Sequence, residues 1–174
     1  MDGFQVTRRL SALLRRFRRS TRGAILVETL IVVPVVVIFA VGLVEFGSLF
    51  WQRQQLQAGV RDAARYVSRC ETEAVEMSNC SFDIARNLAF FGTTDPQPDT
   101  PLRVRGWYED AQLAISLTDV NAAGAAVDAG DEDAVARLVT VTGTATYTGS
   151  PLFGLLRIAD IEFAYSHQER FIGW

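Results

Sequence analysis

Residues 24–44 read AILVETLIVVPVVVIFAVGLV, a run of 21 residues with one charged side chain, Glu28, and one proline, Pro34. An α-helix rises about 1.5 Å per residue, so about 20 apolar residues cross a hydrocarbon core of roughly 30 Å. Strands rich in Val and Ile seldom exceed about eight residues. The run therefore predicts a membrane-spanning helix, to which we assign residues 24–46.

Charged residues are distributed unevenly around this run. All 17 basic residues are Arg, and seven of them precede Gly23, together with a single acid. The rest of the chain holds ten Arg and nineteen acids, and only Arg53 and Arg61 follow the span within about 20 residues. Because Lys and Arg gather on the cytoplasmic side of a span, the pattern predicts a cytoplasmic leader, residues 1–23, and an extracytoplasmic remainder.

Length and composition exclude several classes of protein. A chain of 174 residues forms one modest domain, and a hydrophobic content of 49% excludes a disordered chain. The apolar run is longer than the roughly 7 to 15 residues of a cleavable signal peptide, and VGLVEFGS after it holds no Ala-x-Ala site. Since no phosphate-binding loop, HExxH or GxSxG motif is present, we expect no enzyme, no cofactor and no nucleic-acid partner.

Two cysteines and one histidine, His167, are too few for a four-ligand zinc site. Cys70 and Cys80 enclose nine residues on the predicted extracytoplasmic side, which is oxidising if the cell is bacterial. A disulfide closing so small a loop would stabilise the domain by roughly 2 to 3 kcal/mol. Two unpaired buried thiols are the alternative.

Glu28 lies five residues after Gly23, near the cytoplasmic edge of the predicted span. An ionised carboxylate deep in a bilayer costs roughly 2.5 to 3.5 kcal/mol, so acids in spans are rare and usually functional. A carboxylate this shallow can instead extend to the headgroups. These energies do not decide whether Glu28 is a functional acid within the span or a carboxylate that extends to the headgroups.

The pattern RRSTRG followed by AILVE resembles the processing site of type IV prepilins and pseudopilins. The resemblance implies that a membrane prepilin peptidase cuts after Gly23, so that Ala24 becomes the first mature residue and Glu28 the fifth. The new ammonium of Ala24 and the Glu28 carboxylate would then compensate each other's charge in a low dielectric, where an isolated charge is expensive.

Residues 22–69 are more narrowly similar to TadE-like pseudopilins of the tight-adherence (Tad, or Flp) pilus system. The similarity rests on Glu28, Pro34, the stretch VEFG at 44–47 and the stretch DAARYVSR at 62–69, and it departs at Thr29, where relatives commonly carry Phe. It implies a minor pilin of the bacterial inner membrane that helps assemble a surface pilus for adhesion and either stays in the membrane or enters the filament. Its implied partners are the prepilin peptidase, other pilins, the inner-membrane assembly platform and the lipid bilayer. The alternative is an uncleaved single-pass anchor whose outer domain binds a ligand or an envelope partner.

Residues 47–70 are expected to continue the same helix. Leu56, Val60 and Ala63 recur at helical spacing and predict a stripe that packs on a globular head. A row at steps of four contains Arg53, Gln57, Arg61, Arg65 and Arg69, and like charges four residues apart repel. Arg61, Arg65 and Arg69 therefore either dock an acidic neighbour or form a solvated face. Pro34 lacks an amide donor, and it is either a functional bend or a tolerated residue.

The remainder, residues 71–174, is expected to form an extracytoplasmic α+β head in which a small antiparallel sheet lies against the long helix. FDIARNLAF predicts a short helix, and three prolines in 93–101 predict a connector. Strands are expected at 103–108, 112–117, 137–148 and 160–171, with a short helix or apolar loop at 150–159. Residues 121–134 are expected to form a flexible loop, whose acids miss the EF-hand spacing for calcium and could instead meet the Arg row of a neighbouring copy.

Overall fold

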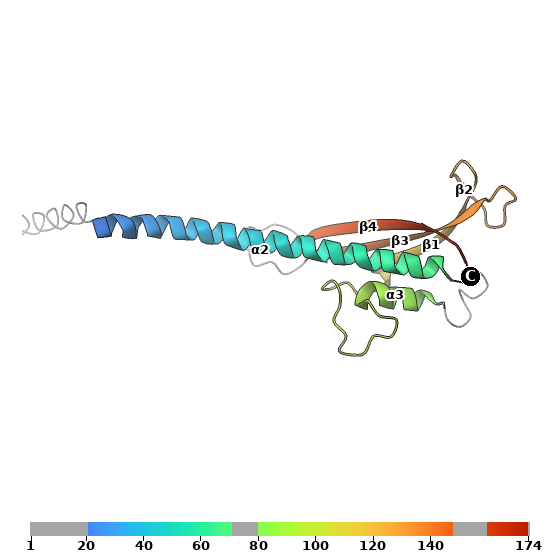
Figure 1. Cartoon of the computed structure of the whole chain (residues 1–174), viewed down its shortest axis with the longest axis horizontal. Helices are drawn as coiled ribbons and strands as arrows, with labels where there is room; N and C mark the ends of the chain where they lie inside the picture. Colours follow the sequence, from blue (N-terminus) through green and yellow to red (C-terminus); the bar gives the residue numbers. More distant parts are fainter. Residues whose placement is uncertain (1–20, 71–79, 148–159, 174) are drawn as a thin grey trace, which may run out of the picture. The chain divides into compact units, whose positions relative to one another are not determined.

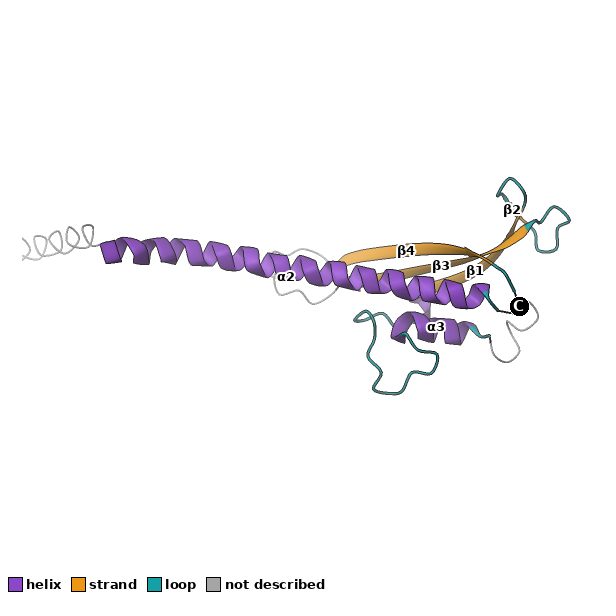
Figure 2. Cartoon of the chain, in the orientation of Figure 1, coloured by secondary structure: helices purple, strands orange, loops and turns teal. Residues whose placement is uncertain are grey.

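The computed structural model of the chain describes residues 21–70, 80–147 and 160–173. Most of the basic leader, residues 1–20, and the apolar segment 150–159 lie outside the described residues. The chain divides into two compact units, residues up to Phe46 and residues from Gly47 onward. Figures 1 and 2 show the elements in chain order. They are α2 (Thr21–Ser68), α3 (Phe82–Phe91), the 3-10 turn η1 (Asp110–Gln112), β1 (Leu113–Val120), β2 (Ala126–Val127), β3 (Ala136–Tyr147) and β4 (Ile161–Arg170).

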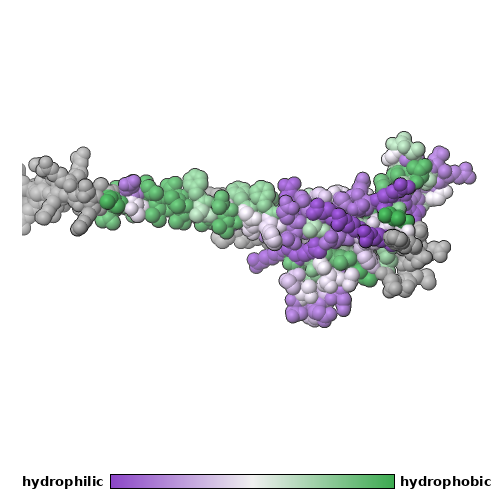
Figure 3. Space-filling model, viewed as in Figure 1, coloured by the Kyte–Doolittle hydropathy of each residue, from purple (hydrophilic) through white to green (hydrophobic). Residues whose placement is uncertain are grey.

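The first unit contains the apolar part of α2. Large apolar side chains on every side of the helix are exposed here, with exposed fractions between 41% at Val41 and 79% at Leu43. The most apolar stretch of the helix has a mean hydropathy of 2.7. On the face seen in Figure 3 this stretch is mostly apolar, with a small hydrophilic patch near its N-terminal end. The helix runs through Pro34 without interruption. By length and composition it is the one described helix able to cross a membrane.

The second unit contains a four-stranded antiparallel sheet with the strand order β2-β1-β3-β4. Side chains alternate along β3, so Val139 and Val141 are buried while Thr140 and Thr142 lie on the other face. The register places Thr140 between Ser116 of β1 and Gln168 of β4. The sheet therefore has one apolar face and one polar face, as its alternating sequence predicts.

The core of the head lies between the sheet, α3 and the part of α2 that follows Phe46. Two glycines permit this packing. A Cβ at Gly59 would collide with the carbonyl oxygen of Ala89, and a Cβ at Gly143 would lie 2.7 Å from Val60. Trp107 is fully buried and meets Phe90 edge to face at 5.0 Å between ring centroids. The buried cluster comprises Leu56, Val60, Ala63, Ala64, Val67, Ala85, Ala89, Phe90, Val104, Trp107, Leu113, Val139, Val141 and Ala145.

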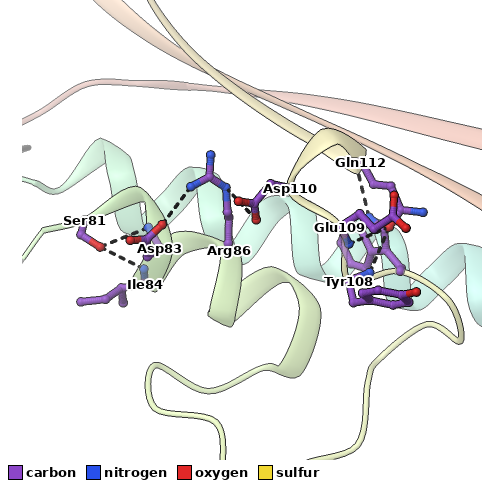
Figure 4. Close-up of polar contacts among 9 residues, drawn as sticks. Ser81, Asp83, Ile84, Arg86, Tyr108, Glu109, Asp110 and Gln112 are labelled. Atoms are coloured by element: carbon purple, nitrogen blue, oxygen red, sulfur yellow. Dashed lines mark hydrogen bonds and ion pairs between the residues drawn. The ribbon is translucent and has the colours of Figure 1, made fainter.

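Short-range polar contacts fix α3 and the segment that follows it (Figure 4). The Ser81 hydroxyl oxygen accepts hydrogen bonds from the backbone amides of Asp83 and Ile84, at 3.1 and 3.2 Å, and so caps the N-terminus of α3. The Arg86 guanidinium lies 2.9 Å from Asp83 and 3.5 Å from Asp110, so it connects α3 with η1. α3 ends at Gly92, whose φ of 78° is accessible to glycine at little cost.

The α+β fold class is confirmed, with one strand assignment wrong. Residues 103–108 form turns: the Trp107 amide donates to the Val104 carbonyl at 3.2 Å, and Gly106 has a φ of 79°. Burial of the Trp107 ring, rather than the alternation that suggested a strand, determines this segment. The short strand β2 lies within residues 121–134, which we had expected to be wholly loop.

Candidate functional site: the processing segment and the surfaces of α2

The predicted cleavage position, between Gly23 and Ala24, lies in α2 close to Thr21, the first described residue, and Gly23 is buried. Glycine lowers helix stability by about 1 kcal/mol relative to alanine. Gly23 therefore makes the helix locally less stable at the predicted cleavage position than alanine would.

Glu28 lies about one turn further along, on an exposed stretch of the helix. No ion pair to its carboxylate is found in the described parts of the chain. Its exposed neighbours Val27 and Leu30 are apolar, and the Thr29 hydroxyl donates to the Ile25 carbonyl at 2.8 Å. The structure thus presents a lone carboxylate on an apolar helix surface. A carboxylate in that setting needs a cation from outside this stretch once water is removed.

A second acid, Glu45, lies at the end of the apolar part of α2, and the sequence assigns it no role beyond its place in the stretch VEFG. Its exposed fraction is only 8%, whereas the neighbouring Val44 and Phe46 are 72% and 53% exposed. The sequence signal that could identify Glu45 is its position as an acid directly after the apolar run. The apolar surface continues past it to Phe50 and Trp51, which are 58% and 65% exposed.

The arginine row changes face along the helix. A step of four residues turns the row by about 40°, so Arg53 lies about 120° around the helix from Arg65. Helix geometry therefore places Arg53 on a different face of α2 from Arg65. Arg65 lies about 180° from the core residue Leu56. Arg61 and Arg65 of α2, with Arg69 just after its end, form a stripe on its outer side, which we call the arginine stripe.

Beside the arginine stripe lies a hollow of about 330 Å³ lined by Asp62, Arg65, Tyr66, Arg69, Cys80 and Leu88. Cys70 and Cys80 are joined as a disulfide, with 5.7 Å between their Cα atoms, and this bond connects the end of α2 to the start of α3. Burial raises the pKa of the Tyr66 phenol above its ordinary value. The hollow therefore combines two cationic side chains, Arg65 and Arg69, with the Asp62 carboxylate and a phenol.

Two buried or half-buried ion pairs elsewhere in the head were not anticipated. Arg103 lies 2.6 Å from Asp62, and Arg137 contacts both carboxylate oxygens of Asp119 at 2.6 and 3.0 Å. The hydrogen bonds from Arg137 lower the pKa of Asp119, and the same contact raises the pKa of Arg137. The partners are far apart in sequence, so only the strand register reveals that Asp119 and Arg137 are adjacent.

The described residues hold no group of three or more His, Cys, Asp or Glu side chains placed to bind a metal ion. His167 lies 3.0 Å from Glu169 on β4 and stacks on Tyr165.

Comparison with known proteins gives one finding. No curated protein and no solved structure matches this chain. Residues 23–65 match the family model described as TadE-like protein. The matched segment contains Gly23, Glu28, Pro34 and the first two arginines of the arginine stripe. The resemblance to the TadE-like family is thereby confirmed over residues 23–65, and it connects this chain with the Tad pilus and its components.

Proposed function

We propose that this chain is a pseudopilin, or minor pilin, that is cut after Gly23 by a prepilin peptidase and then takes part in assembly of a Tad-type adhesive pilus. The observation that carries the proposal is the register of three features within the matched segment. Gly23 precedes the apolar helix, Glu28 follows at the fifth position, and the helix beyond is exposed on all sides.

A bilayer accounts for the exposed apolar surface of α2. A helix that is apolar all round is stable only in a protein core or in a membrane, and none of the most apolar stretch is buried in this chain. The excess of Arg before Gly23 supports a cytoplasmic N-terminus, with the head outside the bacterial inner membrane. An oxidising compartment on that side suits the disulfide between Cys70 and Cys80.

Processing gives Glu28 its partner. Cleavage creates an ammonium group on Ala24, and an ammonium and a carboxylate attract strongly where the effective dielectric is low. The partner of Glu28 is then the ammonium of the same copy or of a neighbouring pilin. An attraction of this kind between copies selects helices that lie side by side in the membrane.

The proposed role is structural rather than catalytic. The polar groups of the head are used in caps, in ion pairs and in the hydroxyl-rich outer face of the sheet. These contacts position the chain's own elements. A pilin needs such a rigid head and a surface for its neighbours, and it needs no reacting group.

The test is to express the full chain with and without a prepilin peptidase and to determine the intact mass and N-terminal sequence of the membrane-bound product. We expect peptidase-dependent loss of residues 1–23, with Ala24 as the first residue. Retention of the leader in both samples would contradict the proposal and would indicate the alternative, an uncleaved single-pass anchor with a partner-binding head.

A further inference from the structure

Arg53, Arg105 and Arg170 form no ion pair with another described residue, and the other described arginines of the head fall into two groups. Arg86, Arg103 and Arg137 each lie within 3.0 Å of a carboxylate. Within the described residues, the arginine stripe has one ion pair, between Arg65 and Glu169 at 3.8 Å, and the Arg65 side chain remains 61% exposed. The stripe therefore carries three positive charges that repel one another and that the described part of the head hardly neutralises.

An acidic segment of the same head has the opposite imbalance. Residues 128–133, which we call the acidic loop, are exposed throughout and include Asp128, Asp131, Glu132 and Asp133. None of these carboxylates forms an ion pair with another described residue. The loop is held in turns, because the Asp131 amide donates to the Asp128 carbonyl at 3.1 Å and the Asp133 amide donates to the Asp131 carboxylate at 3.0 Å. Its charges are thus presented in a defined arrangement.

Both charged surfaces lie at the same end of the head. The Ile172 amide, just after β4, donates to the Ser68 carbonyl at the last turn of α2, at 2.8 Å. The Phe171 amide donates to the Arg137 carbonyl at 2.8 Å, which brings the start of β3 to that end as well. The acidic loop leads directly into β3 (Figure 1). Two copies with the same orientation therefore present both surfaces at the same end of the head, with the loop between β2 and β3 extending beyond the end of α2 (Figure 1).

We propose that the arginine stripe of one copy binds the acidic loop of a second copy of this chain. The hollow beside Arg65 and Arg69 gives the loop a recess, and the four carboxylates are opposite in sign to the three guanidinium groups. The contact is heterologous, because different surfaces of the two copies meet, so the first copy keeps a free acidic loop and the second copy keeps a free arginine stripe. It can therefore extend along a row of copies, and it depends on the proposed function, which brings copies together in one membrane.

A crosslinking experiment with two differently tagged full-length copies tests the contact. One copy carries Arg65→Cys and the other Glu132→Cys; Cys70 and Cys80 are bonded to each other, so each added cysteine is the one free thiol. We expect a disulfide between the two tags at several times the yield of a control pair in which Ser166→Cys, on the exposed outer face of the sheet, replaces Glu132→Cys. Equal yields from the two pairs would overturn the proposal.

Charge reversal distinguishes the ion pairs from mere proximity. Adding Arg61→Glu and Arg69→Glu to the first copy should reduce the crosslink to the level of the control. Adding Asp131→Arg and Asp133→Arg to the second copy should then restore it, and failure of that restoration would overturn the proposal. Near-UV circular dichroism of each variant reports whether the head is folded.

The N-terminal sequence of the same samples separates this proposal from the proposed function. Cleaved chains that do not crosslink would overturn the contact and leave the processing unaffected. Crosslinked chains that keep the leader would uphold the contact and contradict the processing.

Discussion

The two parts of α2, residues 21–46 and residues 47–68, place similar side chains in opposite environments. Leu43 is 79% exposed and Leu56 is fully buried, although both belong to one helix. In the first part the apolar residues surround the helix, and in the second they form a stripe at Leu56, Val60 and Val67. Only the stripe finds its cover within the chain. The difference shows that the arrangement of apolar residues, rather than their number, decides whether a helix is covered by its own head or by something outside the chain.

The largest expected effect is on cleavage of the leader at the N-terminal end of α2. Gly23→Phe places a bulky side chain at the proposed cleavage position, and we expect it to abolish the peptidase-dependent loss of the leader. The matched control is Gly47→Phe, because Gly47 is helical and a Cβ there meets no atom within 4 Å. Mass spectrometry of the membrane fraction measures both. Normal cleavage of the Gly23 variant would refute the assigned position.

The second prediction compares the two leucines directly. Leu56→Ala leaves a cavity in the head and should lower the free energy of unfolding by about 2 to 5 kcal/mol. Leu43→Ala removes the same atoms from an exposed position and should leave the stability of the head unchanged. Thermal unfolding of the full chain in detergent, followed by near-UV circular dichroism, measures the difference. Similar losses for both variants would mean that the two parts of α2 are not distinct.

The third prediction concerns the bond at the end of the second part. Replacing Cys70 and Cys80 by Ser should destabilise the head by roughly 2 to 3 kcal/mol, because the unfolded chain regains the entropy of an open loop. The same thermal measurement, made on the oxidised chain and on the variant, gives the value. A variant as stable as the oxidised chain would show that the disulfide does not contribute to folding.

The smallest effect depends on pH. Arg137 lowers the pKa of Asp119 in the folded head below its unfolded value. The contribution of this carboxylate is therefore complete above the ordinary aspartate pKa of about 3.9 and is lost as the pH falls through the lower folded value. The stability difference between the wild type and Asp119→Asn should be constant near neutral pH and shrink in strong acid. A difference independent of pH would contradict the role assigned to this pair.

Much of the fold follows from local sequence signals. The apolar run predicts the helix, the Val and Thr alternation predicts β3, and the 3.6-residue stripe identifies the buried side of α2. The turn at 103–108 could not be predicted this way, because it depends on burial of Trp107 beneath Gly59 and Gly143. These residues are distant in sequence, and their contact exists only after the helix, α3 and the sheet have come together.

The candidate site divides in the same way. Gly23 and Glu28 are recognisable because their spacing is local, and Arg61, Arg65 and Arg69 because of their helical spacing. The separation of Arg53 from the arginine stripe needs the helix geometry, and the placement of the stripe and the acidic loop at one end of the head needs the contacts of Ser68 and Arg137. Long-range pairs such as Asp119 and Arg137 leave no mark in a single sequence.

The central claim is that the first part of α2 faces lipid while the head faces water. Its most direct test places a single spin label on the full chain in bilayers, at Ile38 or at Ser166, and compares collisions with oxygen and with a water-soluble nickel complex. The account predicts that a label at position 38 is accessible to oxygen and protected from nickel, and that a label at position 166 shows the opposite. Equal access of nickel to both labels would contradict it.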